Sequence, residues 1–340
     1  MLKSYESVVI FGGSGYIGGY TLNHLIENSL AKKVYLLDIK TPRTEVWTPL
    51  TKKTYDRGDV IYIAADVREP IDLDASHVEC IFNFAAIHRE PGHEPAEYFE
   101  TNIKGAEHVV AYAEKVNCKE LVFTSSIAPY GHAEVARTEQ SQVVPYSPYG
   151  SSKLVAEKIH ESWQSRNPDR YLVIVRPGVI FGPHEDGNVP RLKTALKKGL
   201  FCYVGNKSVR KSGGYVKELV TSFFWVLDWA KSRQKHHVLY NFSFPEPPKL
   251  ESYVEAIKKV GDYHKPVPVI PYSMVLAASY VLLTICKPLG IHTPAHPQRI
   301  KKLKVDNQII PQFLIDQGYP YKYDLIESLR DWKSDAPHEW

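Results

Sequence analysis

The feature that most constrains this chain is an apolar run that leads directly into a cluster of glycines. Residues Val8–Phe11 are all apolar, and glycines follow at positions 12, 13, 15 and 18. Apolar residues then recur at helical spacing from Tyr16 to about Glu27. A turn without Cβ atoms lets the backbone approach a pyrophosphate, which the free N–H groups of the helix N-terminus bind. The sequence therefore predicts a strand, a tight turn and a helix that together bind a dinucleotide.

An acidic residue stands where such a turn needs one. The short apolar run Val34–Asp38 predicts a buried strand that ends in a carboxylate, twenty residues after Gly18. A carboxylate at this place accepts hydrogen bonds from the ribose hydroxyls of an adenine dinucleotide, and its charge repels a 2′-phosphate. We therefore expect NAD as the cofactor. Lys40 and Arg43 follow closely, so NADP stays open as an alternative.

Strands and helices alternate along the whole first half of the chain. Further strands are predicted at Val60–Ala64, Ile81–Ala86, Leu121–Ser126 and Leu172–Val175, and long helices at about Pro95–Val116 and Tyr149–Arg166. No helix is expected between residues 41 and 58, which are polar and weakly periodic. Because the strands are continuously apolar, we expect an α/β doubly wound parallel sheet, the Rossmann fold, covered on both faces. Ligands bind such sheets at the carboxyl ends of the strands.

The pattern changes beyond Pro177, where glycine, proline and charged residues increase and the elements become shorter. The expected elements are helices at Asn188–Lys198, Val216–Lys231 and Leu250–Val260, strands at Leu200–Val204 and Val238–Phe242, and two short helical pieces between Asn307 and Trp332. Val238–Phe242 is expected to return to the sheet. The sequence thus predicts a dinucleotide-binding domain of residues 1–177 plus about 236–260. A smaller, partly discontinuous C-terminal α/β substrate domain would comprise residues 178–235 and about 261–340.

Composition excludes several classes of protein. Hydrophobic residues make up 44% of the chain and charged residues 24%, as in ordinary globular domains. The net charge of +4 is small and no long Lys/Arg block occurs, so no nucleic-acid partner is expected. The four cysteines are far apart and form no Cys-x-x-Cys pair, so we expect neither a disulfide framework nor a metal site. The short polar N-terminus is not typical of a signal peptide and favours a cytoplasmic protein.

One uncharged segment complicates this expectation. Residues Tyr272–Cys286 are mostly apolar but too few to cross a membrane, which takes about 20 residues. A buried or partner-packing helix is the simpler interpretation. A helix that lies at a membrane surface or at a subunit interface is the alternative, which leaves membrane association open.

The residues expected to do the chemistry are Tyr149 and Lys153. Their spacing of four places both side chains on one face of a helix. An ordinary tyrosine has a pKa of about 10, and a nearby ammonium, together with the positive charge of an oxidised nicotinamide, lowers that pKa. Tyr149 can then exchange a proton with an alcohol or a ketone while hydride moves at the adjacent carbon. Ser126, at the end of a predicted strand, is placed to hold the substrate oxygen.

Taken together, these motifs resemble the extended short-chain dehydrogenases/reductases of the nucleotide-sugar epimerase/dehydratase group. The resemblance covers the first 185 residues and rests on the glycine turn, Asp38, Asp66-Val67, Asn83–Ala86, Thr101-Asn102, Phe123–Ser126, Ser147–Lys153 and Arg176–Pro183. It implies a homodimer formed through the two long helices. It also implies a nucleotide-diphosphate sugar as substrate, with residues 178–215 selecting it.

The resemblance and the residue patterns together give a set of expected site residues. The catalytic residues are Ser126, Tyr149 and Lys153. The cofactor-binding residues are Gly12, Gly15, Tyr16, Ile17, Gly18, Asp38, Asp66, Val67, Ala85, Ala86, His88, Asn102, Thr124, Tyr149, Lys153, Pro177 and Val179. The substrate-binding residues are Ser125, Ser126, Asn188, Val189, Lys193, Tyr203 and Lys211.

A departure from the family pattern narrows the reaction. The dehydratases of this group have an Asp-Glu pair directly after the catalytic hydroxyl, whereas Ile127-Ala128 stand here. A 4-epimerase or a 4-ketoreductase is therefore favoured over a 4,6-dehydratase. Two alternatives remain: a lipid-alcohol dehydrogenase like the 3β-hydroxysteroid dehydrogenases, which the C-terminal half also resembles, and a non-catalytic scaffold that senses NAD(P).

Overall fold

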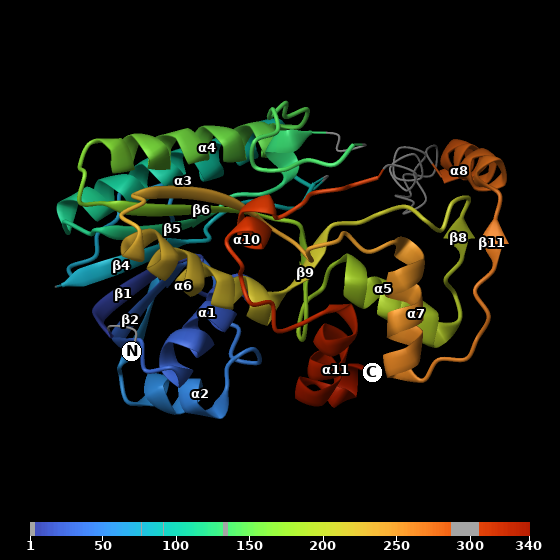
Figure 1. The fold of residues 1–340 in the computed structure, drawn as a ribbon, viewed down its shortest axis with the longest axis horizontal. Helices are drawn as coiled ribbons and strands as arrows, with labels where there is room; N and C mark the ends of the chain where they lie inside the picture. The colour runs from blue at the N-terminus through green and yellow to red at the C-terminus, as the bar shows by residue number, and fades with distance from the viewer. Residues whose placement is uncertain (1–3, 76, 91, 132–134, 287–305) are drawn as a thin grey trace.

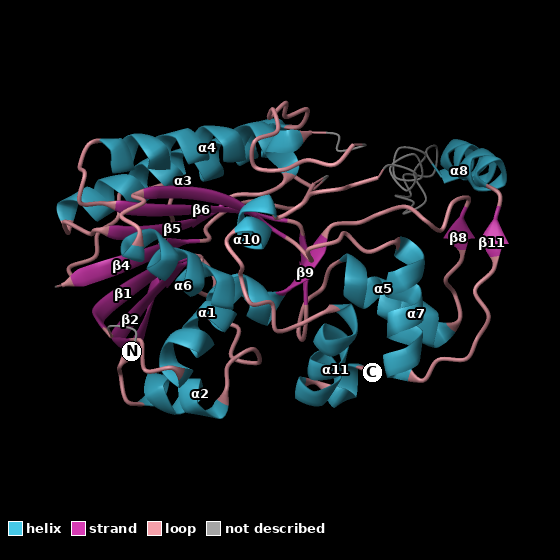
Figure 2. Ribbon diagram, in the orientation of Figure 1, coloured by secondary structure: helices cyan, strands magenta, loops and turns pink. Residues whose placement is uncertain are grey.

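A seven-stranded parallel sheet forms the centre of the larger part of the molecule (Figures 1 and 2). The computed structural model describes residues 4–75, 77–90, 92–131, 135–286 and 306–340. In spatial order the strands are β10 (His237–Phe242), β6 (Tyr171–Pro177), β5 (Glu120–Thr124), β4 (Val78–Asn83), β1 (Tyr5–Phe11), β2 (Ala31–Asp38) and β3 (Val60–Ala64). The order reverses between β1 and β4, which is the switch point where such sheets bind ligands.

Helices cover both faces of the sheet. The long helices α3 (Pro95–Lys115) and α4 (Pro148–Ser165) pack together on one face, and α1 (Tyr16–Glu27), α2 (Pro49–Asp56) and α6 (Val216–Ser232) lie on the other (Figure 1). Alternate residues of a strand point to opposite faces. In β1, Val8 and Ile10 accordingly belong to one hydrophobic core, while Val9 and Phe11 belong to the other. The predicted doubly wound Rossmann fold is confirmed, including the return of residues 237–242 to the sheet.

The helix α2 contradicts the expectation that residues 41–58 contain no helix. It begins at Pro49, whose fixed φ suits the first helical position, and the Thr48 hydroxyl accepts a hydrogen bond from the Thr51 amide at 3.3 Å. Only the threonines at 51 and 54 are buried on this helix. Because its inner face is polar, α2 has no apolar periodicity, and the capping residues were the signal that could have found it.

Among the described residues, the smaller part of the molecule contains short strands and further helices. The helices are α5 (Asn188–Lys198), α7 (Leu250–Gly261), α8 (Tyr272–Cys286) and α11 (Leu325–Asp335), and α7 packs against both α5 and α11. The strands form two pairs, β7 (Val179–Phe181) with β9 (Gly213–Tyr215) and β8 (Tyr203–Val204) with β11 (Val269–Ile270). A further short helix, α10 (Gln312–Asp316), contacts β10.

The strands β7, β9 and β11 were not predicted, because strands of two or three residues have no alternation to detect. The expected strand at residues 200–204 is shorter than predicted. The helix α7, which the predicted division placed with the sheet, packs against α5 and α11. The division into two domains stays a prediction. Among the described helices, none is both long and apolar enough to cross a membrane.

A buried carboxylate connects helix α6 to the C-terminal segment of the chain. Glu218 on α6 accepts hydrogen bonds from the Tyr319 hydroxyl at 2.6 Å and from the backbone amides of Lys322 and Tyr323 at 2.9 and 2.8 Å. Its side chain is buried. The C-terminal segment is therefore held against the helix that covers the sheet.

Replacement of Glu218 by alanine tests this connection. The change leaves three donors without their acceptor, so we expect the free energy of unfolding to fall by about 2–4 kcal/mol. Urea denaturation measures the loss. Glu255→Ala, which removes an exposed carboxylate from α7, is the matched control and should change the free energy by less than about 0.5 kcal/mol. Equal effects of the two substitutions would contradict the structural role of Glu218.

Candidate active site

The strand order brings the predicted site residues to one edge of the sheet. Strands β2, β1, β4, β5 and β6 are consecutive neighbours and all run parallel. Their carboxyl ends therefore place Asp38, the glycine turn, Ala85-Ala86, Thr124–Ser126 and Pro177 along a single edge, in that order.

The glycine turn fits so tightly that side chains are excluded from it. A Cβ atom on Gly12, whose φ is 72°, would lie 2.7 Å from the Ala85 amide nitrogen, and one on Gly18 would lie 2.6 Å from the Gly12 carbonyl oxygen. Gly15 precedes the first turn of α1 and provides no side-chain cap. The first amides of α1 are thus left for an anion, as the sequence predicts. Ile17 packs against the core and holds the helix in place.

The adenosine end of the predicted site is acidic. The carboxylate of Asp38 accepts hydrogen bonds from the amide of Ser14 in the glycine turn at 3.2 Å and from the amide of Lys40 at 3.0 Å. Arg43 was one of the residues that could have bound the 2′-phosphate of NADP. Its guanidinium donates instead to Glu45 at 2.8 Å and to the His184 carbonyl at 2.6 Å. These contacts favour NAD.

The remaining adenosine-side residues follow β3. The Asp66 carboxylate binds the Arg68 guanidinium through both oxygens, which lowers the pKa of Asp66. The adjacent Val67 is buried against Gly105 of α3.

Buried polar atoms without partners mark the same edge. Among the described residues, the Ser14 and Tyr16 hydroxyls of the glycine turn and the Thr124 hydroxyl at the end of β5 are buried without a hydrogen bond. Such atoms are uncommon in folded proteins, and a ligand bound at this edge would satisfy the ones that lie there. Together with the glycine positions that cannot accept a Cβ, they show that the residues present fit an adenine dinucleotide.

The helix α4 presents the expected catalytic residues. Ser147 caps it by accepting a hydrogen bond from the Gly150 amide at 3.2 Å. One turn apart on its inner face lie Tyr149 and Lys153. The side chain of Lys153 is only 2% exposed, and its ammonium lies 4.3 Å from the centre of the Phe123 ring. Burial lowers the pKa of Lys153 to about 7.

The Tyr149 phenol shares a hydrogen bond with Ser126, which joins the two hydroxyls expected to act on the substrate. In the protein alone, burial raises the pKa of Tyr149 to about 12, and the hydrogen bond from Ser126 acts in the opposite direction. The expected lowering of this pKa is therefore not present in the protein by itself. The positive charge of a bound oxidised nicotinamide would lower the pKa of Tyr149.

A buried ion pair lies behind Lys153 and was missed from the sequence. Glu157 follows Lys153 by one further turn and pairs with Arg176 of β6 through two hydrogen bonds of 2.8 and 2.6 Å. The charge of Glu157 raises the pKa of Lys153 against the effect of burial. The signal was present, because Tyr149, Lys153 and Glu157 have the i, i+4, i+8 spacing of one helix face.

Ser125 is placed differently from the prediction. It was expected to contact substrate, but it is buried and its hydroxyl donates to Glu157 at 2.5 Å. The alternation of side chains along β5 turns Ser125 inward toward this ion pair.

Two other predicted cofactor residues lie beside the catalytic helix. Asn102 of α3 is buried, and its amide group bonds both backbone groups of Ile87 and the Ser152 hydroxyl. It thus holds the segment after β4 against α4, which is a supporting role. His88 in that segment is exposed, and desolvation of its imidazole, followed by the charges of Arg89 and Lys153, lowers its pKa.

The predicted substrate residues lie on the smaller part, beyond the turn at Pro177–Val179. The amide of Val179 donates to the Ser212 carbonyl at 3.0 Å and so joins β7 to β9. Asn188 and Val189 form the first turn of α5, whose N-cap Gly187 offers no side-chain cap.

Farther out on this part lie Tyr203 and Lys211. Tyr203 is in β8, and its ring contacts that of Phe201 edge-on. Burial lowers the pKa of Lys211.

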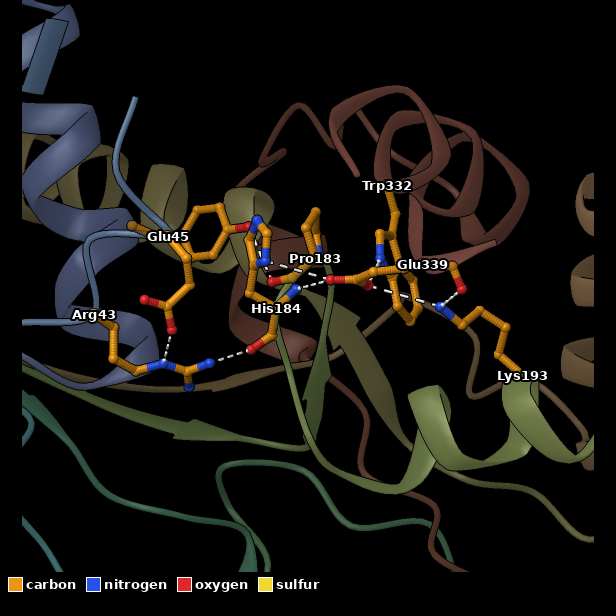
Figure 3. Close-up of polar contacts among 8 residues, drawn as sticks. Arg43, Glu45, Pro183, His184, Lys193, Trp332 and Glu339 are labelled. Carbon is orange, nitrogen blue, oxygen red and sulfur yellow. Dashed lines mark hydrogen bonds and ion pairs between the residues drawn. The ribbon is translucent and has the colours of Figure 1, made fainter. Parts of the chain in front are cut away.

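Lys193 does not lie where the prediction placed it. Its side chain is buried, its ammonium donates to the Glu339 carbonyl at 2.7 Å, and it lies 4.5 Å from the centre of the Trp332 ring (Figure 3). It therefore ties α5 to the C-terminal segment and is not turned toward a substrate. Alternation of charged and apolar residues on α5 could not reveal this partner, which is distant in sequence.

The loop that leads into α5 is fixed by contacts from both sides (Figure 3). His184 has a positive φ of 64°, and its amide donates to the Glu339 carboxylate at 2.9 Å. The second oxygen of Glu339 accepts from the Trp332 indole at 2.6 Å. His184, His338 and Glu339 have potential metal-binding atoms within 4.8 Å of one another. Because both Glu339 oxygens already accept hydrogen bonds, we interpret this group as a structural connection.

The fold and this edge of the sheet define the class of an extended short-chain dehydrogenase/reductase, and comparison with known proteins agrees. The sequence profile of the NAD dependent epimerase/dehydratase family matches residues 8–241. The chain belongs to this family and is an NAD-dependent enzyme of the extended short-chain type. The resemblance seen in the sequence is thereby confirmed.

Individual relatives show how far the similarity extends. The chain is 26% identical to an N-acetyl-alpha-D-glucosaminyl-diphospho-ditrans,octacis-undecaprenol 4-epimerase of Escherichia coli O157:H7, over 95% of this chain and 93% of that protein. It is 27% identical to UDP-glucose 4-epimerase 3 of Oryza sativa subsp. japonica, over 60% of this chain and 57% of that protein. The solved UDP-N-acetylglucosamine 4-epimerase from Methanobrevibacter ruminantium M1 superposes with a TM-score of 0.75 and 20% identity, over 99% and 100% of the two chains, and thus shares the fold.

The buried ammonium of Lys153 predicts a specific dependence of stability on pH. Its pKa is about 7 in the folded protein and about 10.4 in an unfolded chain. Between these values the unfolded chain binds more protons, so this group makes the protein more stable as pH rises. Below pH 7 both states are charged, and the cost of burying the charge is complete.

Lys153→Met removes that cost. The free energy of unfolding of the variant should therefore exceed that of the wild type by more at pH 6 than at pH 9. We expect the difference between the two pH values to be on the order of 2 kcal/mol in the free energy of unfolding by urea. Lys158→Met removes an exposed ammonium from the same helix and should show no such change. A stability difference for Lys153→Met that is the same at both pH values would contradict the burial of a charged group.

Cofactor preference tests the placement of Asp38. Asp38→Ser removes the charged acceptor for the ribose hydroxyls, so we expect the Kd for NAD to rise about 10- to 100-fold. The Kd for NADP should change less or fall, because the repulsion is also removed. Isothermal titration calorimetry measures both constants. Asp59→Ser, a change of a partly exposed carboxylate before β3, is the control, and an unaltered NAD/NADP ratio in Asp38→Ser would exclude the proposed contact.

Proposed function

We propose that the protein is a 4-epimerase that acts on a hexose joined through a diphosphate to a larger carrier. The observation on which this depends is the contact between Ser126 and Tyr149 beside the buried Lys153, at the edge of the sheet where the glycine turn lies. This set can exchange a proton at one carbinol oxygen. The family and the names of the similar proteins favour C4 of a sugar as the reacting carbon.

The chain's own residues account for the proton chemistry. Ser126 donates a hydrogen bond to the substrate oxygen and holds it next to Tyr149. The Tyr149 phenolate, stabilised by the Lys153 ammonium, accepts the hydroxyl proton and later returns it to the oxygen of the ketone. When bound, NAD supplies the acceptor and donor of hydride at its nicotinamide. The sugar must turn between the two half-reactions, so that hydride returns to the opposite face of C4.

The smaller part of the molecule offers groups for the diphosphate. The first turn of α5 contains Asn188 and Val189, and its N-cap residue Gly187 has no side chain to cap it. A helix N-terminus of this kind binds anions. Lys211 supplies a positive charge on the same part of the molecule, and Tyr203 lies on the strand expected beside the carrier. These assignments favour a diphosphate between the sugar and its carrier.

Loss of water is not expected from this site. The positions that follow Ser126 are occupied by Ile127 and Ala128, neither of which can act as an acid or a base. An elimination would need such groups beside the neighbouring carbons. Epimerisation and simple reduction or oxidation at one carbon therefore remain, and epimerisation is the activity we propose.

We also propose a homodimer formed through α3 and α4. These two helices pack side by side on the outer face of the sheet, and each presents an exposed apolar residue, Phe99 and Val155 respectively. A four-helix bundle made with a second copy would cover both residues.

Epimerisation without net cofactor turnover tests the proposal. The purified protein is incubated with UDP-N-acetylglucosamine and, in parallel, with a polyprenyl diphosphate N-acetylglucosamine, and the anomeric NMR signals are followed. We expect the 4-epimer to form from at least one of them with no accumulation of NADH. Stoichiometric NADH formation, or no turnover of either compound, would contradict the proposal.

Tyr149→Phe isolates the role of the phenol. Loss of the proton carrier should lower the rate at least about 100-fold, while NAD still raises the Tm of the variant. Tyr112→Phe is the matched control, since the Tyr112 hydroxyl is buried without a hydrogen bond on α3 and is not part of the site. A variant Tyr149→Phe with wild-type turnover would show that another group carries the proton.

A further inference from the structure

The helix α8 is exposed although it contains no charged residue. Its fifteen residues, Tyr272–Cys286, are mostly apolar, and the side chains of Met274 and Val281 are 62% and 60% exposed. Tyr280 and Leu282 on the same helix are exposed as well. Apolar surface of this kind is uncommon on monomeric proteins and marks a site of interaction.

This helix adjoins the strand on which the far end of the substrate is expected to lie. Only Pro271 separates α8 from β11, and β11 pairs with β8 through Val269 and Tyr203. A Cβ on Gly205, just after β8, would lie 3.2 Å from the Cβ of Tyr272. Figure 1 shows α8, β8 and β11 together at the end of the molecule remote from the large sheet.

Two further exposed apolar side chains extend the same surface. Leu200, which is 77% exposed, precedes β8, and Val269 of β11 is 56% exposed. We call α8 with these two residues the apolar end. The part of the substrate beyond the diphosphate is therefore expected to meet apolar surface, where a nucleoside would need polar partners.

The sequence on either side of α8 is basic. No Asp or Glu occurs between Tyr263 and Val305, whereas the sequence there contains six basic residues: Lys265, Lys287, Arg299, Lys301, Lys302 and Lys304. In the described part of the chain, Lys265 donates to the Lys198 carbonyl at 3.0 Å, two residues before Leu200. An apolar helix with basic flanks is complementary to an anionic bilayer surface.

The length of α8 decides how it would meet a membrane. At about 1.5 Å per residue it is roughly 22 Å long, whereas the hydrocarbon core of a bilayer is about 30 Å thick. It can lie in the interface with its apolar side chains inserted, but it cannot span the core.

We propose that the apolar end docks the enzyme on an anionic phospholipid surface and that the substrate is a sugar diphosphate carried by a membrane-embedded polyprenol. This inference rests on the proposed function for the chemistry at C4. In this arrangement the sugar and the diphosphate lie at the edge of the sheet. The polyprenyl chain passes over β8 and α8 and remains embedded in the bilayer.

Flotation with vesicles tests the docking independently of catalysis. The full chain with NAD is mixed with vesicles of phosphatidylcholine, with or without about 30% phosphatidylglycerol, and centrifuged through a density gradient. We expect the protein to float with the anionic vesicles and at least about tenfold less with the neutral ones. High salt should weaken binding, because it screens the basic flanks. Failure of the wild type to float with anionic vesicles overturns the proposal.

Two substitutions on α8 and one elsewhere identify the surface. Met274→Asp and Val281→Asp each place a carboxylate on the exposed face, so each should reduce flotation about tenfold or more. Leu50→Asp changes an equally apolar exposed residue of α2 and should float like the wild type. NAD-dependent stabilisation checks that every variant is folded. If both α8 variants float as well as the wild type, the docking surface is not α8 and the proposal is wrong.

Activity on the two carriers separates this proposal from the proposed function. The α8 variants should retain any turnover of UDP-N-acetylglucosamine in solution, while turnover of the polyprenyl diphosphate sugar in anionic vesicles falls about tenfold or more. Equal loss on both substrates would contradict a docking role. If neither substrate is epimerised by the wild type but the protein still floats through α8, the proposed function fails and the docking surface stands.

Discussion

The arrangement of this molecule depends on keeping an ammonium group out of water. Lys153 lies between α4 and β5, where burial alone would favour loss of its proton. Glu157 opposes that effect, and Arg176 in turn holds Glu157 through two hydrogen bonds. Removal of Glu157 or Arg176 would leave the other as a buried charge without its partner, which costs more than the pair contributes. Lys153 can therefore stay charged beside Tyr149 only while α4 packs against α3 and β5 pairs with β6.

What the sequence could predict was local or repeated at fixed spacing. The glycine turn, Asp38, Ser126 and the Tyr149–Lys153 pair each follow a strand or share one helix face, and the structure brings them to a single edge of the sheet. The parallel sheet followed from continuous apolar strands. The catalytic and binding roles of these residues stay predictions, which the substitutions described above address.

What the sequence could not predict depends on partners that are distant in the chain. Lys193 is charged and near a predicted diphosphate site, yet Glu339 determines where it points. Ser125 precedes the catalytic serine, yet Glu157 turns it inward. The helix α2 has a polar inner face, and β7, β9 and β11 are so short that only their pairing identifies them as strands. For Lys193, Ser125 and the short strands, the decisive contact joins segments that are distant in the chain, so no local pattern predicts it.

The cover of the sheet by α6 has a consequence for synthesis of the chain. Phe82 and Phe84, at the end of β4, pack against Phe223 and Phe224 with ring centres 5.5–6.4 Å apart. About 140 residues separate these partners, so at roughly 5–20 residues per second the aromatic face of the sheet waits about 7–30 s on the ribosome for its cover. During that interval the nascent chain presents an unprotected apolar face. A mutation that slows the docking of α6 would therefore lower the yield of protein through aggregation, even where the finished enzyme is fully stable.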